Sequence, residues 1–160
     1  MSNLLYRDDD INYLTSVDEL RRIHAPFKRH NKIHTVACEM YRLWENKSLF
    51  WFLLTDEHIN VELHGWQHNP HYMMLPNVIY EEFKKSIDYW EGHAKRMLLV
   101  SELPELKRIT TYCATWNKSS KNIEEICKLM NLKLSTNNGD CAWMFHYWET
   151  TPNQVEEKLR

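Results

Sequence analysis

The chain has 160 residues and a mass of 19.5 kDa, with 43% hydrophobic and 26% charged residues. A domain of this size buries roughly 70% of the surface that its unfolded chain exposes, which is enough for a full core without metal or disulfide cross-links. The longest apolar run, 49–54, is far shorter than the ~20 residues that a membrane span needs, and the N-terminus shows no secretory signal. We therefore expect one soluble domain over residues 1–160, with no membrane span.

Charge and cysteine content argue against two further classes of protein. Twenty Lys and Arg residues against 22 Asp and Glu residues give a net charge of −2, without the basic surplus of a nucleic-acid binder. The four cysteines form no closely spaced pair, and each lies in an apolar context, as reduced buried thiols do. These features predict a protein of a reducing compartment, the cytoplasm, with no nucleic-acid partner.

The first elements expected along the chain are a short apolar opening at 4–6 and a helix. Ser16 and Glu19 have the spacing of a capping box, which places the start of this helix near residue 16. Pro26 marks its expected end.

A group of strands is expected next. Residues 35–44 contain a β-prone stretch, and the apolar run 49–54 is typical of a strand that is buried on both faces. Alternation returns at 59–63, and 72–75 is a candidate for a further strand. Together these segments predict a meander of three strands.

The second half of the chain begins with the clearest helical pattern. Apolar residues follow one face over 78–97, and Asn77 is a suitable N-cap. Residues 109–116 are rich in β-branched and aromatic side chains, which predicts a strand. Residues 121–130 then predict a second amphipathic helix.

The end of the chain shows a hairpin signal. Two β-prone segments, 132–134 and 142–148, flank the turn sequence 137–140. The order of elements predicts an α+β or layered α/β domain with one central sheet.

This order resembles the GNAT superfamily of N-acetyltransferases. The opening sequence 6–11 and the strand and helix at 109–130 carry the resemblance, which also extends to small GNAT-like proteins of tailed phages. The resemblance implies a mixed central sheet of about six to seven strands, flanking helices and a C-terminal hairpin. It also implies a splayed sheet that holds acetyl-CoA under the helix at 78–97.

The resemblance further implies positions for the cofactor. GNAT enzymes bind the pyrophosphate at a glycine-rich loop before the long helix, but segment 73–78 has neither Gly nor Arg, and Pro76 removes an N–H donor. The asparagine of the family's closing motif corresponds either to Asn117 or to Ser120. The cofactor-binding candidates are therefore Leu75, Asn77, Val78, Asn117 and Ser120.

Acyl transfer to an amine needs a base and an acid, and the same resemblance suggests both. Glu62 is the first candidate for the base, with His64 or His71 behind it, and Cys127 and Tyr112 are candidates for the acid. The structural alternative is that Glu62 lies on the solvent face of its strand and that Cys127 belongs to the core.

The most unusual local feature is a histidine-rich segment at 64–71. His64 and His68 have the i, i+4 spacing of helical metal ligands, but Gly65 and Pro70 argue against a helix, and no cysteine accompanies them. We therefore expect a polar loop and no metal.

Two hypotheses about function stay open. One is a GNAT-like acyltransferase that uses acetyl-CoA and an amine acceptor but lacks the usual pyrophosphate loop. The other is a non-catalytic GNAT-fold protein of a tailed phage, in the host cytoplasm or the virion, which binds a protein partner or assembles into an oligomer. The aromatic residues at 143–148 favour an interface if they are exposed.

Overall fold

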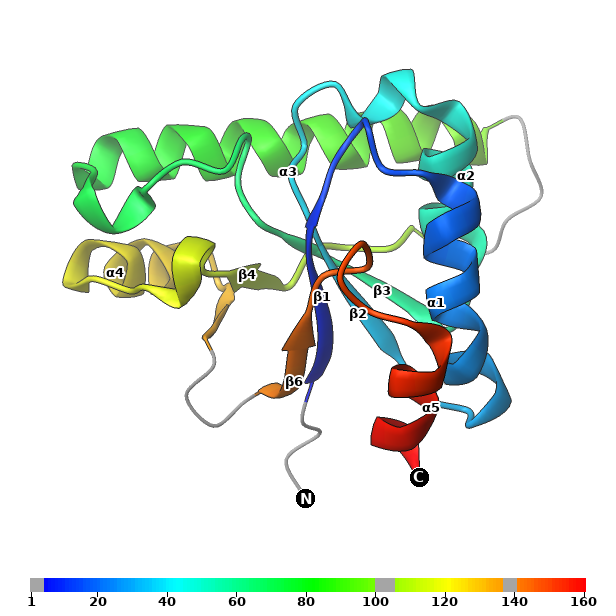
Figure 1. The fold of residues 1–160 in the computed structure, drawn as a ribbon. Helices are drawn as coiled ribbons and strands as arrows, with labels where there is room; N and C mark the ends of the chain where they lie inside the picture. Colours follow the sequence, from blue (N-terminus) through cyan, green and yellow to red (C-terminus); the bar gives the residue numbers. More distant parts are fainter. Residues whose placement is uncertain (1–4, 100–105, 137–140) are drawn as a thin grey trace.

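A parallel sheet lies at the centre of the molecule, and helices cover it (Figure 1). The computed structural model describes residues 5–99, 106–136 and 141–160. Within them the strands are β1 (Leu5–Ile11), β2 (His34–Cys38), β3 (Ile59–Leu63), β4 (Thr111–Cys113), β5 (Lys133–Ser135) and β6 (Cys141–Phe145). The α-helices are α1 (Val17–Arg29), α2 (Lys47–Thr55), α3 (Pro76–Leu98), α4 (Lys121–Leu129) and α5 (Pro152–Leu159). Short 3-10 turns are η1 (Leu43–Glu45), η2 (His71–Met73) and η3 (Thr115–Asn117).

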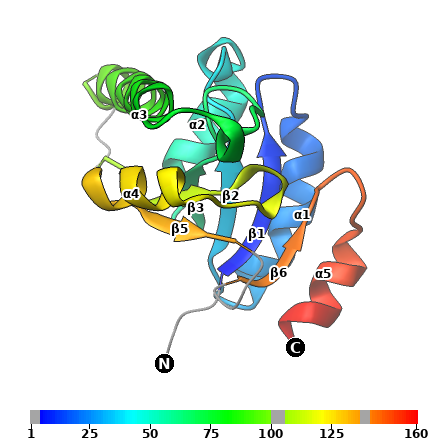
Figure 2. The same ribbon diagram turned by 90° about the vertical axis from the view of Figure 1, so that its left-hand side faces the viewer.

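The strand order within the described residues is β5-β4-β3-β2-β1-β6, and each neighbouring pair is parallel. Figure 2 shows β5, β3, β2, β1 and β6 following one another in this order, with α1 and α5 next to each other beyond β1 and β6. Helices α1 to α4 connect successive strands from β1 to β5, which is the usual way to join parallel neighbours. The carboxyl ends of the strands consequently meet at one edge of the sheet.

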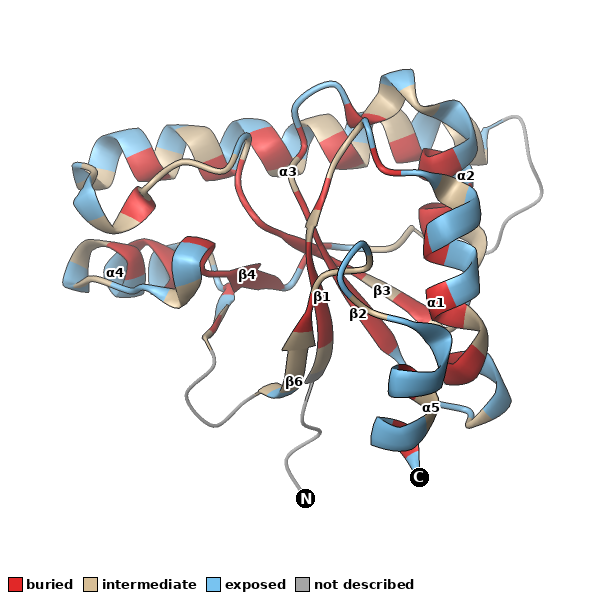
Figure 3. Ribbon diagram, in the orientation of Figure 1, coloured by how far each residue is buried: buried red, intermediate tan, exposed pale blue. Residues whose placement is uncertain are grey.

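The central strands are buried on both faces, as the colours in Figure 3 show. All five residues of β2 are buried, which fits a strand that has helices above and below it. The main core extends from this sheet to the apolar faces of α2 and α3, where Phe50, Phe83 and Trp90 are fully buried.

The first predicted helix is confirmed. Ser16 is the N-cap of α1, and its side chain accepts a hydrogen bond from the backbone N–H of Glu19. The predicted end at Pro26 is wrong, because the helix continues through Pro26 to Arg29.

The predicted strand at 49–54 is wrong, because this segment lies in α2. Asn46 caps the helix by accepting a hydrogen bond from the backbone N–H of Leu49, and its side-chain amide donates to the carbonyl oxygens of Tyr13 and Thr15. A short run that is apolar on all sides is equally compatible with a buried strand and a buried helix. The cap and its tertiary contacts decide for the helix.

The predicted meander and C-terminal hairpin are also wrong. Within 72–75 the chain forms part of η2 and a loop, and β2 and β3 are parallel neighbours separated by α2. Strand β5 pairs with β4, whereas β6 pairs with β1 at the opposite edge of the sheet. The turn signal at 137–140 lies outside the described residues. The α/β class and a six-stranded sheet agree with the prediction, but the mixed GNAT-like sheet does not.

The two helices predicted in the second half are confirmed with small shifts. Helix α3 begins at Pro76 with Leu75 as the N-cap residue, so Asn77 lies inside the first turn. Ser120 is the N-cap of α4 and accepts a hydrogen bond from the backbone N–H of Ile123. None of the helices in the described ranges combines the length and apolar character needed to cross a membrane.

Candidate functional site

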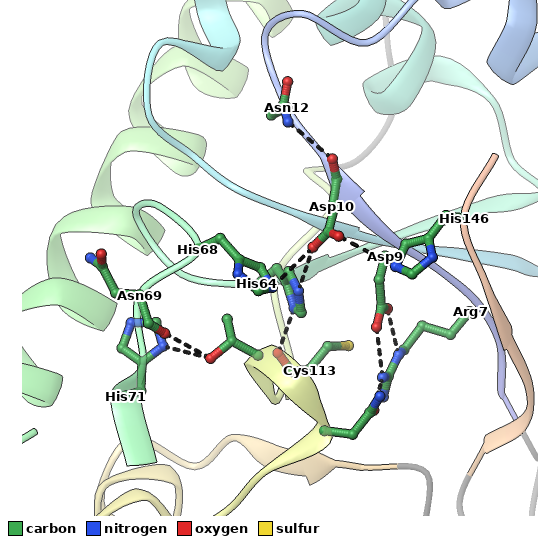
Figure 4. A network of polar contacts seen from close by, with 12 residues as sticks. Arg7, Asp9, Asp10, Asn12, His64, His68, Asn69, His71, Cys113 and His146 are labelled. Carbon is green, nitrogen blue, oxygen red and sulfur yellow. Dashed lines mark hydrogen bonds and ion pairs between the residues drawn. The ribbon is translucent and has the colours of Figure 1, made fainter. Parts of the chain in front are cut away.

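Acidic and imidazole side chains gather where three strands reach the carboxyl edge of the sheet. Asp10 lies near the end of β1, His64 directly follows β3, and His146 directly follows β6. His68 joins them from the loop after His64 (Figure 4). In parallel α/β sheets this edge is where ligands and substrates usually bind. It is therefore the first place to look for a functional site.

Asp10, His64 and His68 form a compact group of potential metal ligands. The Oδ1 atom of Asp10 lies 2.9 Å from Nε2 of His64 and 3.2 Å from Nε2 of His68. One ligand atom from each residue falls within 4.8 Å of the others. Asp10 has a φ of 63°, a left-handed conformation that Asp tolerates better than most residues. This turn of the backbone accompanies the approach of its carboxylate to both imidazoles.

The hydrogen bonding of His64 leaves its second nitrogen without a proton to donate when the ring is neutral. Its Nδ1 lies 2.7 Å from the carbonyl oxygen of Cys113, which only accepts, so Nδ1 carries the hydrogen. The lone pair on Nε2 then faces the carboxylate of Asp10. Among the described residues neither Nε2 of His64 nor Oδ1 of Asp10 has a hydrogen-bond partner, and both atoms are buried. Two buried acceptors this close require a proton or a cation between them.

The pKa values in this group reflect the same electrostatics. Burial lowers the pKa of His64, but the Asp10 carboxylate and the charge of Asp9 outweigh it, and the net shift is upward. Burial raises the pKa of Asp10, but His64, His68 and His146 outweigh it, and the net shift is downward. The group therefore favours a negative carboxylate that is compensated by positive charge.

A buried ion pair lies beside this group on the same strand. The Nε and Nη2 atoms of Arg7 donate to the two carboxylate oxygens of Asp9 at 2.6 and 2.8 Å. Arg7 is fully buried and also donates to Ser135 at 2.8 Å and to Asn117 at 2.6 Å. This bidentate contact fixes the orientation of the Asp9 carboxylate and compensates its charge.

His146 and two tryptophans complete the surroundings. The Nε2 atom of His146 lies 3.3 Å from Oδ2 of Asp10, and its ring stacks on Trp148 with centroids 4.7 Å apart. Trp116 packs edge to face against His68 at 4.2 Å. Both tryptophans are about half exposed, at 50% and 51%. They present apolar ring surface to solvent beside the polar group.

Several solved structures have a similar arrangement of strands and helices. A family 4 carbohydrate esterase from Streptomyces lividans, in complex with acetate, superposes with a TM-score of 0.70 and 10% identity, over 99% of this chain and 87% of that one. This chain has the fold of that carbohydrate esterase family. A CE4 family pseudoenzyme from Bacillus anthracis gives a TM-score of 0.62 and 16% identity, over 84% of this chain and 43% of that one. A family 4 acetyl xylan esterase from Clostridium thermocellum, in complex with a cobalt ion, gives a TM-score of 0.54 and 11% identity, over 81% of this chain and 55% of that one.

These similarities establish the carbohydrate esterase fold for the described chain. The chain spans about half the length of the pseudoenzyme chains, 43% in one structure and 53% in two variants. No protein-family model matches the sequence, and neither does any curated protein.

The GNAT resemblance is wrong, and with it the acetyl-CoA acyltransferase and the non-catalytic GNAT-fold phage protein. The structural neighbours are carbohydrate esterases and deacetylases, and the sheet is parallel instead of mixed. The resemblance arose because an alternation of strands and helices with a long central helix is common to both folds. The direction of the strands, which separates them, is not visible in the local pattern.

The structure places Glu62, the predicted base, between two strands. It is buried in β3, and its carboxylate accepts hydrogen bonds from the backbone N–H groups of Thr110 and Thr111 at 3.0 and 2.5 Å and from Asn60 at 2.8 Å. Burial raises its pKa although these hydrogen bonds lower it. Among the described residues β3 and β4 share a single register pair, so this carboxylate supplements a short ladder.

The predicted acids are both buried. Cys127 lies in the core face of α4, where burial raises the pKa of its thiol to about 12. Burial also raises the pKa of Tyr112, whose hydroxyl lies 2.9 Å from Nδ1 of His71. Neither residue contacts Asp10 in the described structure.

The cofactor candidates do not form one group. Leu75, Asn77 and Val78 lie exposed at the start of α3, and Ser120 caps α4. Asn117 alone reaches the site described above, through its hydrogen bond with Arg7.

Sequence analysis missed Arg7, Asp9, Asp10 and His146 as functional candidates. The signal for Asp9 and Asp10 is a run of aspartates directly after an apolar strand start, which the resemblance explains only as part of the family's opening. His64 and His68 were noticed for their spacing, and the structure brings them together through a loop instead of a helix.

Proposed function

We propose that this protein is a metal-dependent hydrolase that removes acetyl groups from a carbohydrate. The observation that carries the proposal is the convergence of Asp10, His64 and His68, with ligand atoms within 4.8 Å, in a chain with the carbohydrate esterase fold. The expectation of no metal rests on the absence of a helix at 64–71 and of an accompanying cysteine, and a loop-borne site of histidine and carboxylate ligands needs neither.

The ligand set suits a divalent ion of the zinc or cobalt type. Two imidazoles and one carboxylate are the protein ligands of many catalytic zinc sites, which keep a fourth position for water or substrate. The Nδ1–H of His64 is held by the carbonyl of Cys113, a contact that fixes the ligating tautomer. Oδ1 of Asp10 and Nε2 of His64, which face each other at 2.9 Å without a hydrogen bond, are the atoms that such an ion would satisfy. When bound, it would polarise the acyl carbonyl and lower the pKa of a bound water.

Asp9 and His146 are suited to moving the protons of the reaction. Hydrolysis consumes one water, releases acetate and returns a proton to the sugar amine or hydroxyl. Asp9, held by Arg7 and adjacent in sequence to Asp10, accepts the proton of the attacking water. His146, on the other side of Asp10, is partly exposed and protonates the leaving group. The two groups thus have opposite roles.

The half-exposed tryptophans fit a carbohydrate substrate. Trp148 stacks on the imidazole of His146, and Trp116 packs edge to face against the imidazole of His68. Their open faces offer apolar surface to the C–H face of a sugar ring, with polar groups close by for its substituents.

The proposal is tested by measuring acetate release from acetylated xylan and from N-acetylglucosamine oligomers. The protein is stripped with a chelator and reloaded with Zn²⁺ or Co²⁺. We expect metal-dependent release that falls by at least about 100-fold in Asp9→Asn, because proton transfer by a positioned group contributes about that much. In His68→Ala, addition of metal is expected to give no increase in acetate release over the stripped protein.

His93→Ala is the matched control, since it removes an imidazole of α3 that stacks on Trp44 instead of reaching the site. It should leave acetate release unchanged. Absence of acetate release from the metal-loaded wild-type protein on both substrates would contradict the proposed activity.

A further inference from the structure

The loop that carries His68 is held in a tight conformation. Gly65, directly after His64, has a φ of +109°, which an L side chain rarely adopts. Two close backbone hydrogen bonds follow, from Asn69 N–H to the Gln67 carbonyl at 2.7 Å and from His71 N–H to the Asn69 carbonyl at 2.8 Å. The position of His68 therefore depends on how this loop is fixed to the rest of the molecule.

One carboxylate from the long helix contacts the loop at three points. Glu82 of α3 accepts hydrogen bonds from the backbone N–H of Trp66 at 3.1 Å, from the side-chain amide of Asn69 at 3.1 Å, and from Nε2 of His71 at 2.7 Å. These residues lie on both sides of His68 in the sequence. The carboxylate is mostly buried, with 13% of its side chain exposed, so its contacts are little weakened by solvent.

Strand β4 and the turn η3 that follows it hold the same loop from the other side. Because Nε2–H of His71 donates to Glu82, its Nδ1 accepts, and the hydroxyl of Tyr112 donates to it at 2.9 Å. The hydroxyl of Thr115 donates to the carbonyl of Asn69 at 2.7 Å. His71 thus joins the helix to the sheet through the loop.

The backbone at Gly65 packs so closely against His71 that only a residue without a Cβ fits there. A Cβ atom on Gly65 would lie 2.6 Å from Cε1 of His71 and 2.7 Å from the carbonyl oxygen of Gln67. The imidazole of His71, which Glu82 accepts a hydrogen bond from, therefore also packs against the start of the loop at Gly65.

We infer that Glu82 is a positioning residue for the proposed metal site, acting on His68 through the loop 65–71 and the imidazole of His71. The inference rests on the proposed function, since the site it prepares is the Asp10–His64–His68 group. His64 is anchored independently by the carbonyl of Cys113, whereas the imidazole of His68 is 28% exposed and contacts Asp10 and the rings of His64 and Trp116. The loop is also held at its start, where the backbone N–H groups of Met40 and Tyr41 donate to the carbonyl oxygens of Gly65 and Trp66. Loss of the Glu82 contacts should thus loosen His68 and leave the other ligands in place.

The experiment is a Co²⁺ titration of the chelator-stripped protein, followed by the visible absorption of the bound ion. We expect Glu82→Ala to weaken Co²⁺ affinity about tenfold, the lower end of what loss of an outer-shell contact costs, and to change the spectrum at saturation. The Co²⁺ affinity of Glu82→Gln should lie between that of the wild type and that of Glu82→Ala, since its amide oxygen still accepts a hydrogen bond from the backbone N–H of Trp66. Glu81→Ala, at the exposed neighbouring position of α3, should bind like the wild type.

Two outcomes distinguish the role of Glu82 from the proposed metal-dependent function. All titrations are made at a temperature where circular dichroism shows each variant to be folded. Wild-type protein that takes up no Co²⁺ overturns the proposed function and the inference together. If the wild type binds and Glu82→Ala binds with the same affinity and spectrum, the inference alone is overturned.

Discussion

Two buried histidines show how the core controls protonation at the level of single residues. The Nδ1 atoms of His24 and His34 lie 3.3 Å apart, and Nε2 of His24 lies 3.2 Å from the Asp56 carboxylate. A neutral pair can share one N–H between the facing nitrogens, whereas two charged rings would repel each other. Burial lowers the pKa of His24 to about 4 and that of His34 to about 3. The native state therefore binds these protons far less readily than the unfolded chain.

This difference predicts a loss of stability in mild acid that depends on His24. Its folded pKa lies below the unfolded value of 6.5, so its contribution is complete above pH 6.5 and is lost as the pH falls toward 4. We expect the free energy of unfolding of the wild type to fall relative to that of His24→Gln by about 2 kcal/mol between pH 6.5 and 5. Urea denaturation of both proteins at each pH measures this.

The comparison with the variant is necessary because other charged groups face the pair. Asp56 opposes the fall in the His24 pKa, and Lys28 adds to it. Asp8 lies 3.6 Å from Nε2 of His34, and burial raises its pKa, which gives stability the opposite pH dependence. Equal pH dependence in the wild type and in His24→Gln would contradict the prediction.

At the scale of the elements, the junction of β3 and β4 depends on one side chain. Glu62 accepts two backbone hydrogen bonds from the start of β4 where the ladder itself is short. In Glu62→Gln the amide oxygen can keep the two backbone hydrogen bonds, but an amide nitrogen then replaces Oε1, which accepts from the side chains of Asn60 and Thr110, and the charge that strengthens all four bonds is lost. We expect the free energy of unfolding to fall by about 2 kcal/mol, with Co²⁺ affinity unchanged. Chemical denaturation and metal titration of the same preparations measure the two quantities.

The exposed Glu57, in the turn before β3, provides the control for this prediction. Glu57→Gln removes a carboxylate with 87% of its side chain exposed and should change neither quantity. A Glu62→Gln protein as stable as the wild type would show that the carboxylate does not support the junction.

The same scale shows which elements the sequence could predict. Helices α1, α3 and α4 were found because each has a polar face opposite an apolar face, so that periodicity alone identifies it. Helix α2 has no such contrast, and the features that favour it over a buried strand are the cap that Asn46 forms and its contacts with Tyr13 and Thr15. Strand direction was missed for a related reason. A parallel sheet is specified by where its crossovers pack, which is a tertiary property.

At the scale of the whole molecule, the candidate site draws on β1, on the loop after β3 and on the end of β6. Asp10 and His146 are far apart in the sequence and meet because β6 joins the sheet beside β1. Sequence spacing could therefore suggest His64 with His68 but could not add Asp10 or His146. The run of aspartates is ambiguous for the same reason. Asp8 lies beside His34 in the core and Asp9 is held by Arg7, while Asp10 faces the imidazoles.

Because the ligands come from separate parts of the chain, a bound ion would stabilise the fold as a whole. The unfolded chain cannot hold Asp10 close to His64 and His68, so binding to the native state adds directly to stability. At a Zn²⁺ concentration 100 times Kd the gain is about 2.7 kcal/mol, which corresponds to a rise in Tm of about 5–10 °C for a chain of this length. Differential scanning calorimetry of stripped and Zn²⁺-loaded protein measures it. The rise should be absent in His68→Ala and retained in His93→Ala. Mg²⁺, which prefers oxygen ligands, should give no comparable rise. A Zn²⁺-dependent rise of equal size in His68→Ala would place the ion elsewhere in the molecule.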